Sequence, residues 1–123
     1  MNTMQLEIGG KEYTFKASIA FMRDLNKKVK EKANDRDVDV GMIYSLAGVI
    51  DRDIEALIDV LYAMNINFTP RIKKETLESY IEDCEDIDGL FDEVTDFLSK
   101  ANVSKAKMKQ LMDAIKKNQK GTK

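Results

Sequence analysis

The chain has 123 residues, a formal net charge of −2, one cysteine and no histidine. Without histidine it cannot form a Ser-His-Asp or Cys-His catalytic site or a histidine metal site, and one cysteine permits neither an internal disulfide nor a structural zinc site. The apolar runs are too short to span a membrane and no signal-peptide pattern opens the chain, so we expect a cytosolic, non-catalytic protein without a cofactor.

The segment MQLEIGGKEYTF, residues 4–15, alternates apolar and polar residues on both sides of Gly9-Gly10. A two-residue glycine turn accepts the positive φ that tight hairpins need. The resulting register pairs Met4 with Phe15 and Leu6 with Tyr13 on an apolar face, and Glu7 with Glu12 as like charges on the other. Because a lone hairpin is marginally stable in water, the apolar face must be covered by the helices or by another chain.

Helical spacing of apolar residues accounts for most of the remaining chain. Ser18 is the expected N-cap of a helix over about residues 19–33, and the polar segment NDRDVDVG that ends at Gly41 is predicted to be a loop. Further helices are predicted over residues 42–50, 53–65, 73–84 and 86–99, with either Asp51 or Asp53 as the cap of the second. Ser104 is the expected cap of a last helix, and residues 116–123 should fray.

The helix over residues 53–65 has the widest apolar stripe, which predicts that it is the central and most buried helix. Its stripe contains Ile54, Leu57, Ile58 and Leu61, widened by Val60 and Met64. The elements together predict an α+β, mostly α fold, in which an N-terminal β-hairpin packs on a bundle of about five to six helices. We expect residues 1–100 to form a globular domain and residues 101–123 to form a basic helix with a frayed tail.

Charge is separated along the sequence. Residues 75–98 contain ten acids and no base, whereas residues 105–123 contain seven lysines and one acid, Asp113. The two blocks can pair within one chain, or the basic tail of one copy can meet the acidic face of another. Solvated outer faces of amphipathic helices are the ordinary explanation of such an acidic run, and a docking surface for a basic partner is the alternative.

Of two more specific explanations of these charges, a calcium site fails and nucleic-acid binding is the less favoured one. The Asp86-Ile87-Asp88-Gly89 spacing resembles the start of a calcium loop, but the twelfth position holds Phe97 instead of glutamate. The lysine-rich tail contains neither arginine nor an aromatic residue, which argues against nucleic-acid binding.

Cys84 lies on an apolar stripe beside Ile81 and is expected to be a buried, inert thiol.

The last helix carries an apolar stripe after the domain already looks complete. Core packing is the ordinary explanation of such a stripe, but methionine also suits adaptable contact surfaces, and a dimer seam or a client groove are further alternatives. We therefore predict a partner-binding surface from the stripe and two neighbouring lysines, namely Met108, Leu111, Met112, Ile115, Lys105 and Lys109. No catalytic, cofactor-binding or metal-binding residue is predicted.

A diffuse pattern of apolar positions around a Gly-Lys turn runs over about residues 4–98. It consists of Ile8-Gly9-Gly10-Lys11, Tyr13 and Phe15, then Phe21, Met22 and Leu25, then Val40-Gly41, the helix Leu57–Leu61, Leu77, Tyr80 and Ile81, and finally DIDGLFDEVTDFL. This pattern resembles the tail assembly chaperones of long, non-contractile-tailed phages and prophages, especially those of Gram-positive hosts. It includes no chemical signature and leaves the basic tail outside.

The resemblance implies a non-catalytic factor in the host cytoplasm that binds the tape measure protein, keeps it soluble and promotes assembly of the tail tube. Members of this family are absent from the mature virion, and many are made in a short form and a frameshifted longer form, of which this chain would be the short one. The expected partners are the tape measure protein, the tail tube protein and further copies of the chain. The alternatives are a structural virion protein, such as a tail completion or connector subunit, and a nucleic-acid-binding regulator.

Overall fold

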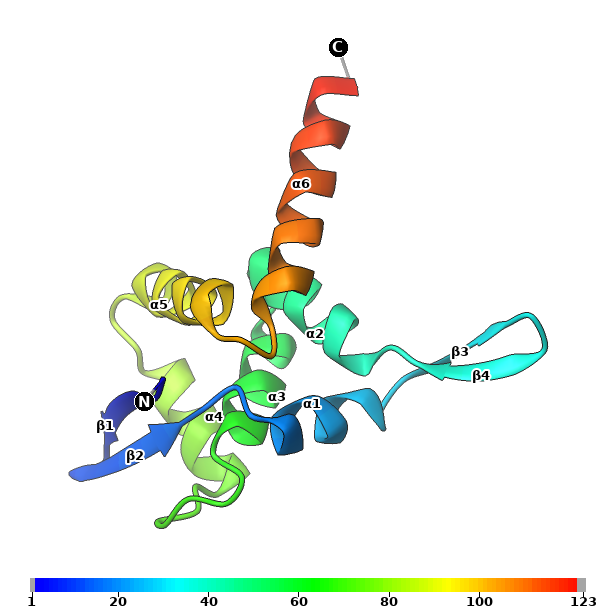
Figure 1. Ribbon diagram of the computed structural model, residues 1–123. Coiled ribbons are helices and arrows are strands. Elements are labelled where there is room, and N and C mark those ends of the chain that lie inside the picture. The colour runs from blue at the N-terminus through cyan, green and yellow to red at the C-terminus, as the bar shows by residue number, and fades with distance from the viewer. Residues whose placement is uncertain (1, 122–123) are drawn as a thin grey trace.

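The computed structural model describes residues 2–121 of the chain as two small hairpins and six helices (Figure 1). In chain order the elements are β1 (Met4–Ile8), β2 (Lys11–Phe15), α1 (Ile19–Asn26), β3 (Lys30–Ala33), β4 (Arg36–Asp39), α2 (Gly41–Ile50), α3 (Ile54–Met64), α4 (Lys74–Glu82), α5 (Ile87–Lys100) and α6 (Lys105–Gly121). The predicted α+β, mostly α class with an N-terminal hairpin on helices is therefore confirmed.

The first hairpin has the predicted register. Met4 pairs with Phe15, Leu6 with Tyr13 and Glu7 with Glu12, and the antiparallel strands are joined through Gly9 and Gly10. Both glycines have the positive φ that a turn of this kind requires, at 59° and 81°. One face of the hairpin is buried on the helices, and it consists of Met4, Leu6, Ile8, Tyr13 and Phe15. The helices of the same chain thus supply the cover that the apolar face needs.

Helix α3 lies at the centre of the molecule, as its wide stripe predicted. Seven of its eleven residues are buried, more than in any other helix whose burial is recorded, and α1, α2 and α4 pack around it. Asp53 is the cap, because its side chain accepts a hydrogen bond from the backbone N–H of Glu55 at 3.1 Å. The predicted stripe is wrong at Ile54, which is 42% exposed, while Ala56 and Ala63 are buried instead.

Asn65, at the end of α3, joins three segments of the chain. Its side-chain amide donates to the Thr14 carbonyl at 2.8 Å, and its carbonyl oxygen accepts from the backbone N–H of Ile72 at 2.6 Å. Next to it, the backbone N–H of Lys16 donates to the Met64 carbonyl at 2.8 Å. Asn65 is fully buried, so these bonds fix the first hairpin and the loop around Pro70 to the central helix.

A second hairpin replaces part of the predicted first helix and the loop after it. Helix α1, capped by Ser18 as predicted, ends at Asn26, and residues 27–40 form an arm built on β3 and β4. The two ends of the arm lie next to each other at the body, where the N–H of Val40 donates a hydrogen bond to the Val29 carbonyl at 3.0 Å. Asn26 then accepts a bond from the N–H of Met42 at 2.9 Å, at the start of α2.

Helices α5 and α6 complete the core. Asp86 accepts a hydrogen bond from the N–H of Gly89 at 2.9 Å, so the DIDG segment begins α5 with a capping aspartate. Buried Ser104 precedes α6, and its hydroxyl donates to the Leu98 carbonyl at 2.6 Å. Helix α6 continues through Gly121, into the segment expected to fray, and residues 122 and 123 lie outside the described part of the chain.

Candidate protein-binding surface

The predicted partner-binding residues lie along α6, and the burial of its apolar side chains decreases from the beginning of the helix toward its end. Met108 is 1% exposed and belongs to the core, whereas Leu111 and Met112 are half-buried against it. Ile115 is 37% exposed, and Lys105 and Lys109 are exposed. Core packing therefore explains the beginning of the stripe, while its later residues leave apolar surface uncovered where α6 rises from the body (Figure 1).

An open groove lies beside the first turns of α6, and we call it the α6 groove. Its volume is about 520 Å³, and it is lined by Ser99, Lys105, Ala106, Met108, Lys109 and Met112. Four of the six predicted partner-binding residues meet there, and Leu111 and Ile115 are outside the lining. The groove thus combines two methionines with two lysine side chains, of which Lys109 lies 3.4 Å from the Asp113 carboxylate.

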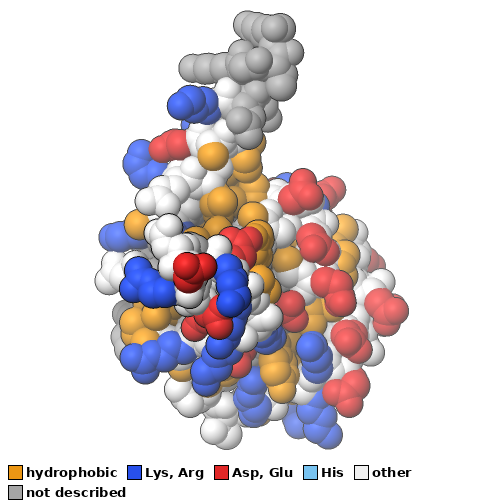
Figure 2. Space-filling view, turned by 90° about the vertical axis from the view of Figure 1, so that its right-hand side faces the viewer, with side chains coloured by type: hydrophobic (Ala, Val, Ile, Leu, Met, Phe, Trp, Pro, Cys, Tyr) orange, Lys and Arg blue, Asp and Glu red, His pale blue; other side chains and the backbone are white. Residues whose placement is uncertain are grey.

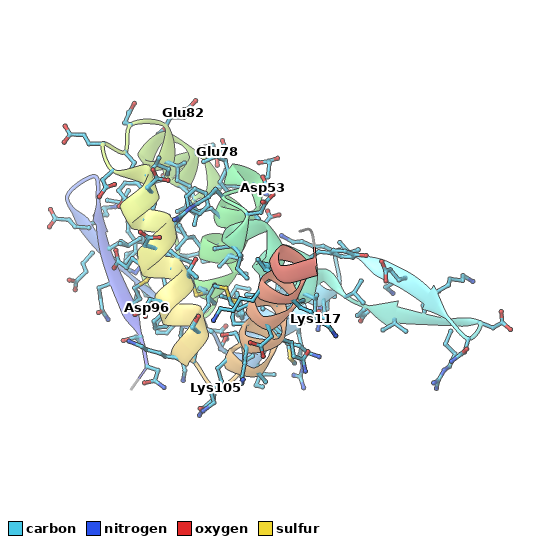
Figure 3. All side chains as sticks on the ribbon, turned by 90° about the horizontal axis from the view of Figure 1, so that it is seen from above. Asp53, Glu78, Glu82, Asp96, Lys105 and Lys117 are labelled. Atoms are coloured by element: carbon cyan, nitrogen blue, oxygen red, sulfur yellow. The ribbon has the colours of Figure 1, made fainter. Side chains whose placement is uncertain are left out.

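The basic and acidic blocks of the sequence do not neutralise each other in the described part of the chain. Helix α6 packs against α5 and α2, yet the ion pair recorded for its described lysines is Lys109 with Asp113 within the same helix. Figure 3 shows Glu78 and Glu82 on α4 well apart from Lys105 and Lys117 on α6. The basic helix thus lies against one of the two acidic helices, as the internal arrangement predicts, but no ion pair joins the two blocks among the described residues.

Arg52, which lies outside α5, forms ion pairs with acidic residues of α5. The sequence gave no indication of this pairing. Its guanidinium lies 2.6 Å from the Asp92 carboxylate and 3.9 Å from that of Asp88, and it stands over the Phe91 ring at 5.4 Å. Arg52 follows α2 with a φ of 62°. Within α5, Asp96 forms an ion pair with Lys100 at 3.2 Å.

A second groove lies between the first hairpin and α4, and we call it the α4 groove. Its volume is about 730 Å³, and its lining consists of Ile8, Gly9, Glu75, Thr76, Ser79, Tyr80, Asp83, Cys84 and Glu85. Burial raises the pKa of Tyr80, and the nearby Cys84 and Glu93 raise it further. Cys84 is half-buried in this lining, which corrects the expectation of a buried thiol. The hairpin side of the groove requires the tertiary structure, so the sequence alone could not show it.

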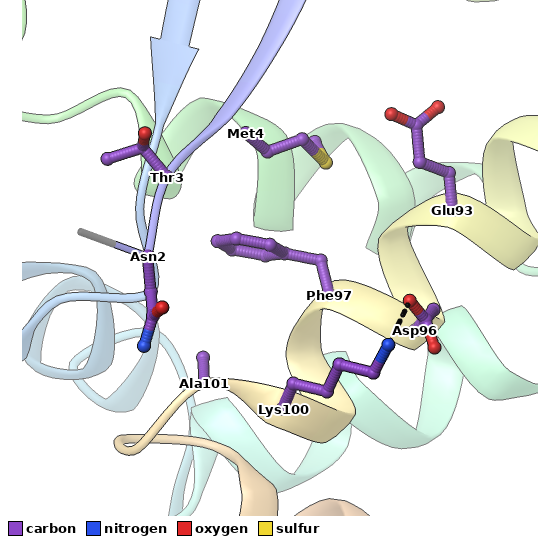
Figure 4. Close-up of a pocket in the computed structure, with 8 residues that line it drawn as sticks. All are labelled: Asn2, Thr3, Met4, Glu93, Asp96, Phe97, Lys100 and Ala101. Atoms are coloured by element: carbon purple, nitrogen blue, oxygen red, sulfur yellow. Dashed lines mark hydrogen bonds and ion pairs between the residues drawn. The ribbon is translucent and has the colours of Figure 1, made fainter.

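A smaller hollow between the start of β1 and α5 carries no evident chemistry (Figure 4). It measures about 320 Å³ and is lined by Asn2, Thr3, Met4, Glu93, Asp96, Phe97, Lys100 and Ala101. Its lysine is already paired with Asp96. Over residues 2–121 no group of three histidine, cysteine or acidic side chains is placed to hold a metal ion, and no helix there is long and apolar enough to cross a bilayer.

Acidic side chains gather on one side of the face shown in Figure 2, and lysines and arginines lie on its other side and along α6. A surface of this kind, with two apolar grooves of different charge, suits contact with other proteins.

Comparison with known proteins gives one match. A family model described as "Phage tail assembly chaperone protein, TAC" matches residues 5–113. The matched span includes the second hairpin, all of the first hairpin except Met4 and the whole lining of the α6 groove, and it ends before Ile115. No curated protein and no solved structure matches the chain.

Proposed function

The chain belongs to the phage tail assembly chaperone family, and from that premise we propose that it binds the tape measure protein in the host cytoplasm and promotes assembly of the tail tube around it. The role is non-catalytic and uses no cofactor. The observation that carries the proposal is the α6 groove, where half-buried Met112, next to the core residue Met108, lines an open apolar surface beside the exposed Lys105 and Lys109.

The groove suits one side of an amphipathic helix. Helix-in-groove recognition requires apolar surface for the anchors of the helix, and methionine adapts its shape to anchors of different size. A chaperone for a long helical client must accept many successive segments, so adaptable contacts serve better than one tightly matched pocket. Lys105 and Lys109 favour segments whose apolar face is flanked by acidic residues.

Co-expression with a helical fragment of the tape measure protein tests this proposal. We expect wild-type chain to keep the fragment in the soluble fraction, and a Met112→Asp variant to lose it, because a carboxylate in the groove would have to be desolvated when the helix binds. Met112 is half-buried, so the folded state of the variant must be checked by circular dichroism.

Val38→Asp is the matched control. Val38 is also an apolar residue, 41% exposed, but it lies on β4, away from α6. This variant should retain the fragment as well as wild type does. Equal retention by folded Met112→Asp would contradict the assignment of the α6 groove as the client site.

The proposed location has its own test. An assembly chaperone should be abundant in extracts of cells making particles and absent from purified mature particles. Mass spectrometry of both samples distinguishes it from a tail completion or connector subunit, which would be recovered in the particles at a fixed ratio to the tube protein.

A further inference from the structure

We propose that a basic trough on the side of the molecule opposite α6 binds an acidic amphipathic helix of another protein. Helix α3 forms the floor of the trough, and α1 and the start of α4 lie on its two sides (Figure 1). The partner helix is defined by its chemistry, an apolar stripe flanked by aspartate or glutamate. The trough and the α6 groove lie at opposite ends of the body, so each can be tested without the other.

The floor of the trough is the outward stripe of α3 and of the turn after it. Asp59, Tyr62 and Ile66 follow one another at helical spacing, and all three are half-buried. Ile66 and Ile19 of α1 line a shallow hollow of about 340 Å³ between them. Ile19 is 49% exposed, so an apolar strip is left uncovered where α1 meets the end of α3.

The α1 side of the trough is positively charged. Ile19, Arg23 and Lys27 are each four residues apart, so they follow one face of α1 and its C-cap. Arg23 and Lys27 line the hollow together with the two isoleucines, and both are exposed. Neither has an ion pair with an acidic residue of the described chain. The hollow therefore has an apolar base with free cations at its rim.

The opposite side of the trough holds an arginine that is already positioned. The Arg71 guanidinium lies 4.0 Å from the centre of the Tyr62 ring and donates from Nη1 to the Tyr62 carbonyl at 2.7 Å. Its hydrogen bonds to described residues all use Nη1, so Nε and Nη2 remain to bind a carboxylate side by side. Exposed Lys73 follows, and Lys74 lies 5.8 Å from the same ring. Beyond Lys74, α4 is acidic, so the trough is basic only at the start of that helix.

Two acids in the trough favour a protein partner over nucleic acid. Asp59 lies 3.8 Å from Lys28 and 3.9 Å from Lys74, and Asp24, which also lines the hollow, lies 3.9 Å from Lys28. These carboxylates would repel a phosphate backbone, and the Tyr62 ring is covered by arginine where a base would stack. A helix instead places its apolar stripe on the floor and its carboxylates against the free cations on both sides.

A synthetic peptide tests the trough. The probe is a fluorescent helical peptide of about 18 residues, with a leucine stripe flanked by glutamates. Anisotropy at low salt should show that wild type binds it, and Arg23→Glu with Lys27→Glu should weaken binding by at least about tenfold, because two attractions become repulsions. Ile19→Ser should weaken binding several-fold through loss of the apolar contact. A peptide with glutamine in place of glutamate should also bind at least about tenfold more weakly.

Lys116→Glu with Lys117→Glu is the matched control. It makes the same change of net charge at exposed positions of α6, on the other side of the molecule, and should bind the peptide as wild type does. Urea midpoints should stay near that of wild type in every variant, because all the substituted side chains are exposed. An equal loss in this control, or no binding by wild type, would overturn the proposal.

A photo-cross-linking version of the peptide locates the site. Cross-links should fall within residues 19–28 and 59–74, and Met112→Asp should bind the peptide as wild type does. Cross-links within residues 99–112 would place the peptide in the α6 groove and overturn the proposal. So would displacement by the tape measure fragment, tighter binding of a DNA duplex, or a molar mass that Arg23→Glu with Lys27→Glu lowers, since the trough would then bind the client, nucleic acid or a second copy.

Discussion

The two hairpins of this protein have similar strand lengths and opposite environments. In β1–β2 one face is buried, and Phe15 is fully enclosed by the helices. In β3–β4 every described side chain is exposed, and the cross-strand pairs Lys30 with Asp39 and Lys32 with Asp37 form ion pairs at 4.0 and 3.9 Å. Exposed ion pairs contribute little to stability, so the arm depends on its turn and on its attachment at the base.

The difference shows that a hairpin can serve as part of a core or as an extension of it. The turn of the arm has two residues with positive φ, Asn34 at 54° and Asp35 at 64°, which suits a tight hairpin. Its base is closed by the bond between Val29 and Val40. We therefore expect the first hairpin to unfold with the whole domain and the arm to open locally.

The largest effect is expected from Phe15→Ala, which removes the most buried side chain of the first hairpin. Loss of a buried phenylalanine lowers the free energy of unfolding by about 3–5 kcal/mol, because it leaves a cavity as well as losing apolar burial. Val38→Ala in the arm should lower it by less than about 0.5 kcal/mol. Urea unfolding of both variants measures the contrast, and similar losses would contradict it.

A smaller loss is expected when the first hairpin is detached from α3. Asn65→Ala leaves the Thr14 carbonyl and the Ile72 N–H without their partner, and unfolding should become easier by about 2–3 kcal/mol. Asn102→Ala, at an exposed position, is the control and should have almost no effect. Equal urea midpoints for the two variants would show that the buried amide does not fix the hairpin.

A gain is expected from relieving the like-charge pair of Glu7 and Glu12. Glu7→Lys should stabilise the protein by up to about 1 kcal/mol at low salt, because the pair then has opposite charges. The gain should shrink as salt screens it. Adding Glu12→Lys restores a like-charge pair and should abolish the gain, which thermal unfolding of the three proteins can verify.

The smallest effect is expected from removing the arm. Since the N–H of Val40 already bonds to the Val29 carbonyl at 3.0 Å, an Asn-Gly turn can replace residues 30–39 between them. The free energy of unfolding should stay within about 0.5 kcal/mol of wild type. A cooperative loss of the helical signal at much lower urea would show that the arm supports the core after all.

The arm also marks where sequence-based prediction failed. The sequence KEKANDRDVD lacks the apolar alternation of a half-buried strand because both of its faces meet water, and its lysine-rich first part is therefore included in the helix that the sequence predicts over about residues 19–33. The alternation of Val38 and Val40 with Asp37 and Asp39 was the available indication of a strand. In α6 four of the six residues proposed from the sequence line the α6 groove, but the sequence could not tell that Met108 is buried while Ile115 is not.

The sequence by itself determined the features that depend on near neighbours. The register around Gly9-Gly10 and the cap at Ser18 follow from period and turn chemistry over a few residues, as does most of the apolar face of each helix, whereas the choice of Asp53 over Asp51 as a cap came from the structure. Only the tertiary structure decided which distant groups meet: Asn65 with Thr14, Arg52 with Asp92, and Ile8 beside Tyr80 in the α4 groove. Such contacts join segments far apart in the chain, and no local pattern specifies them because the packing of all the helices sets their distances at once.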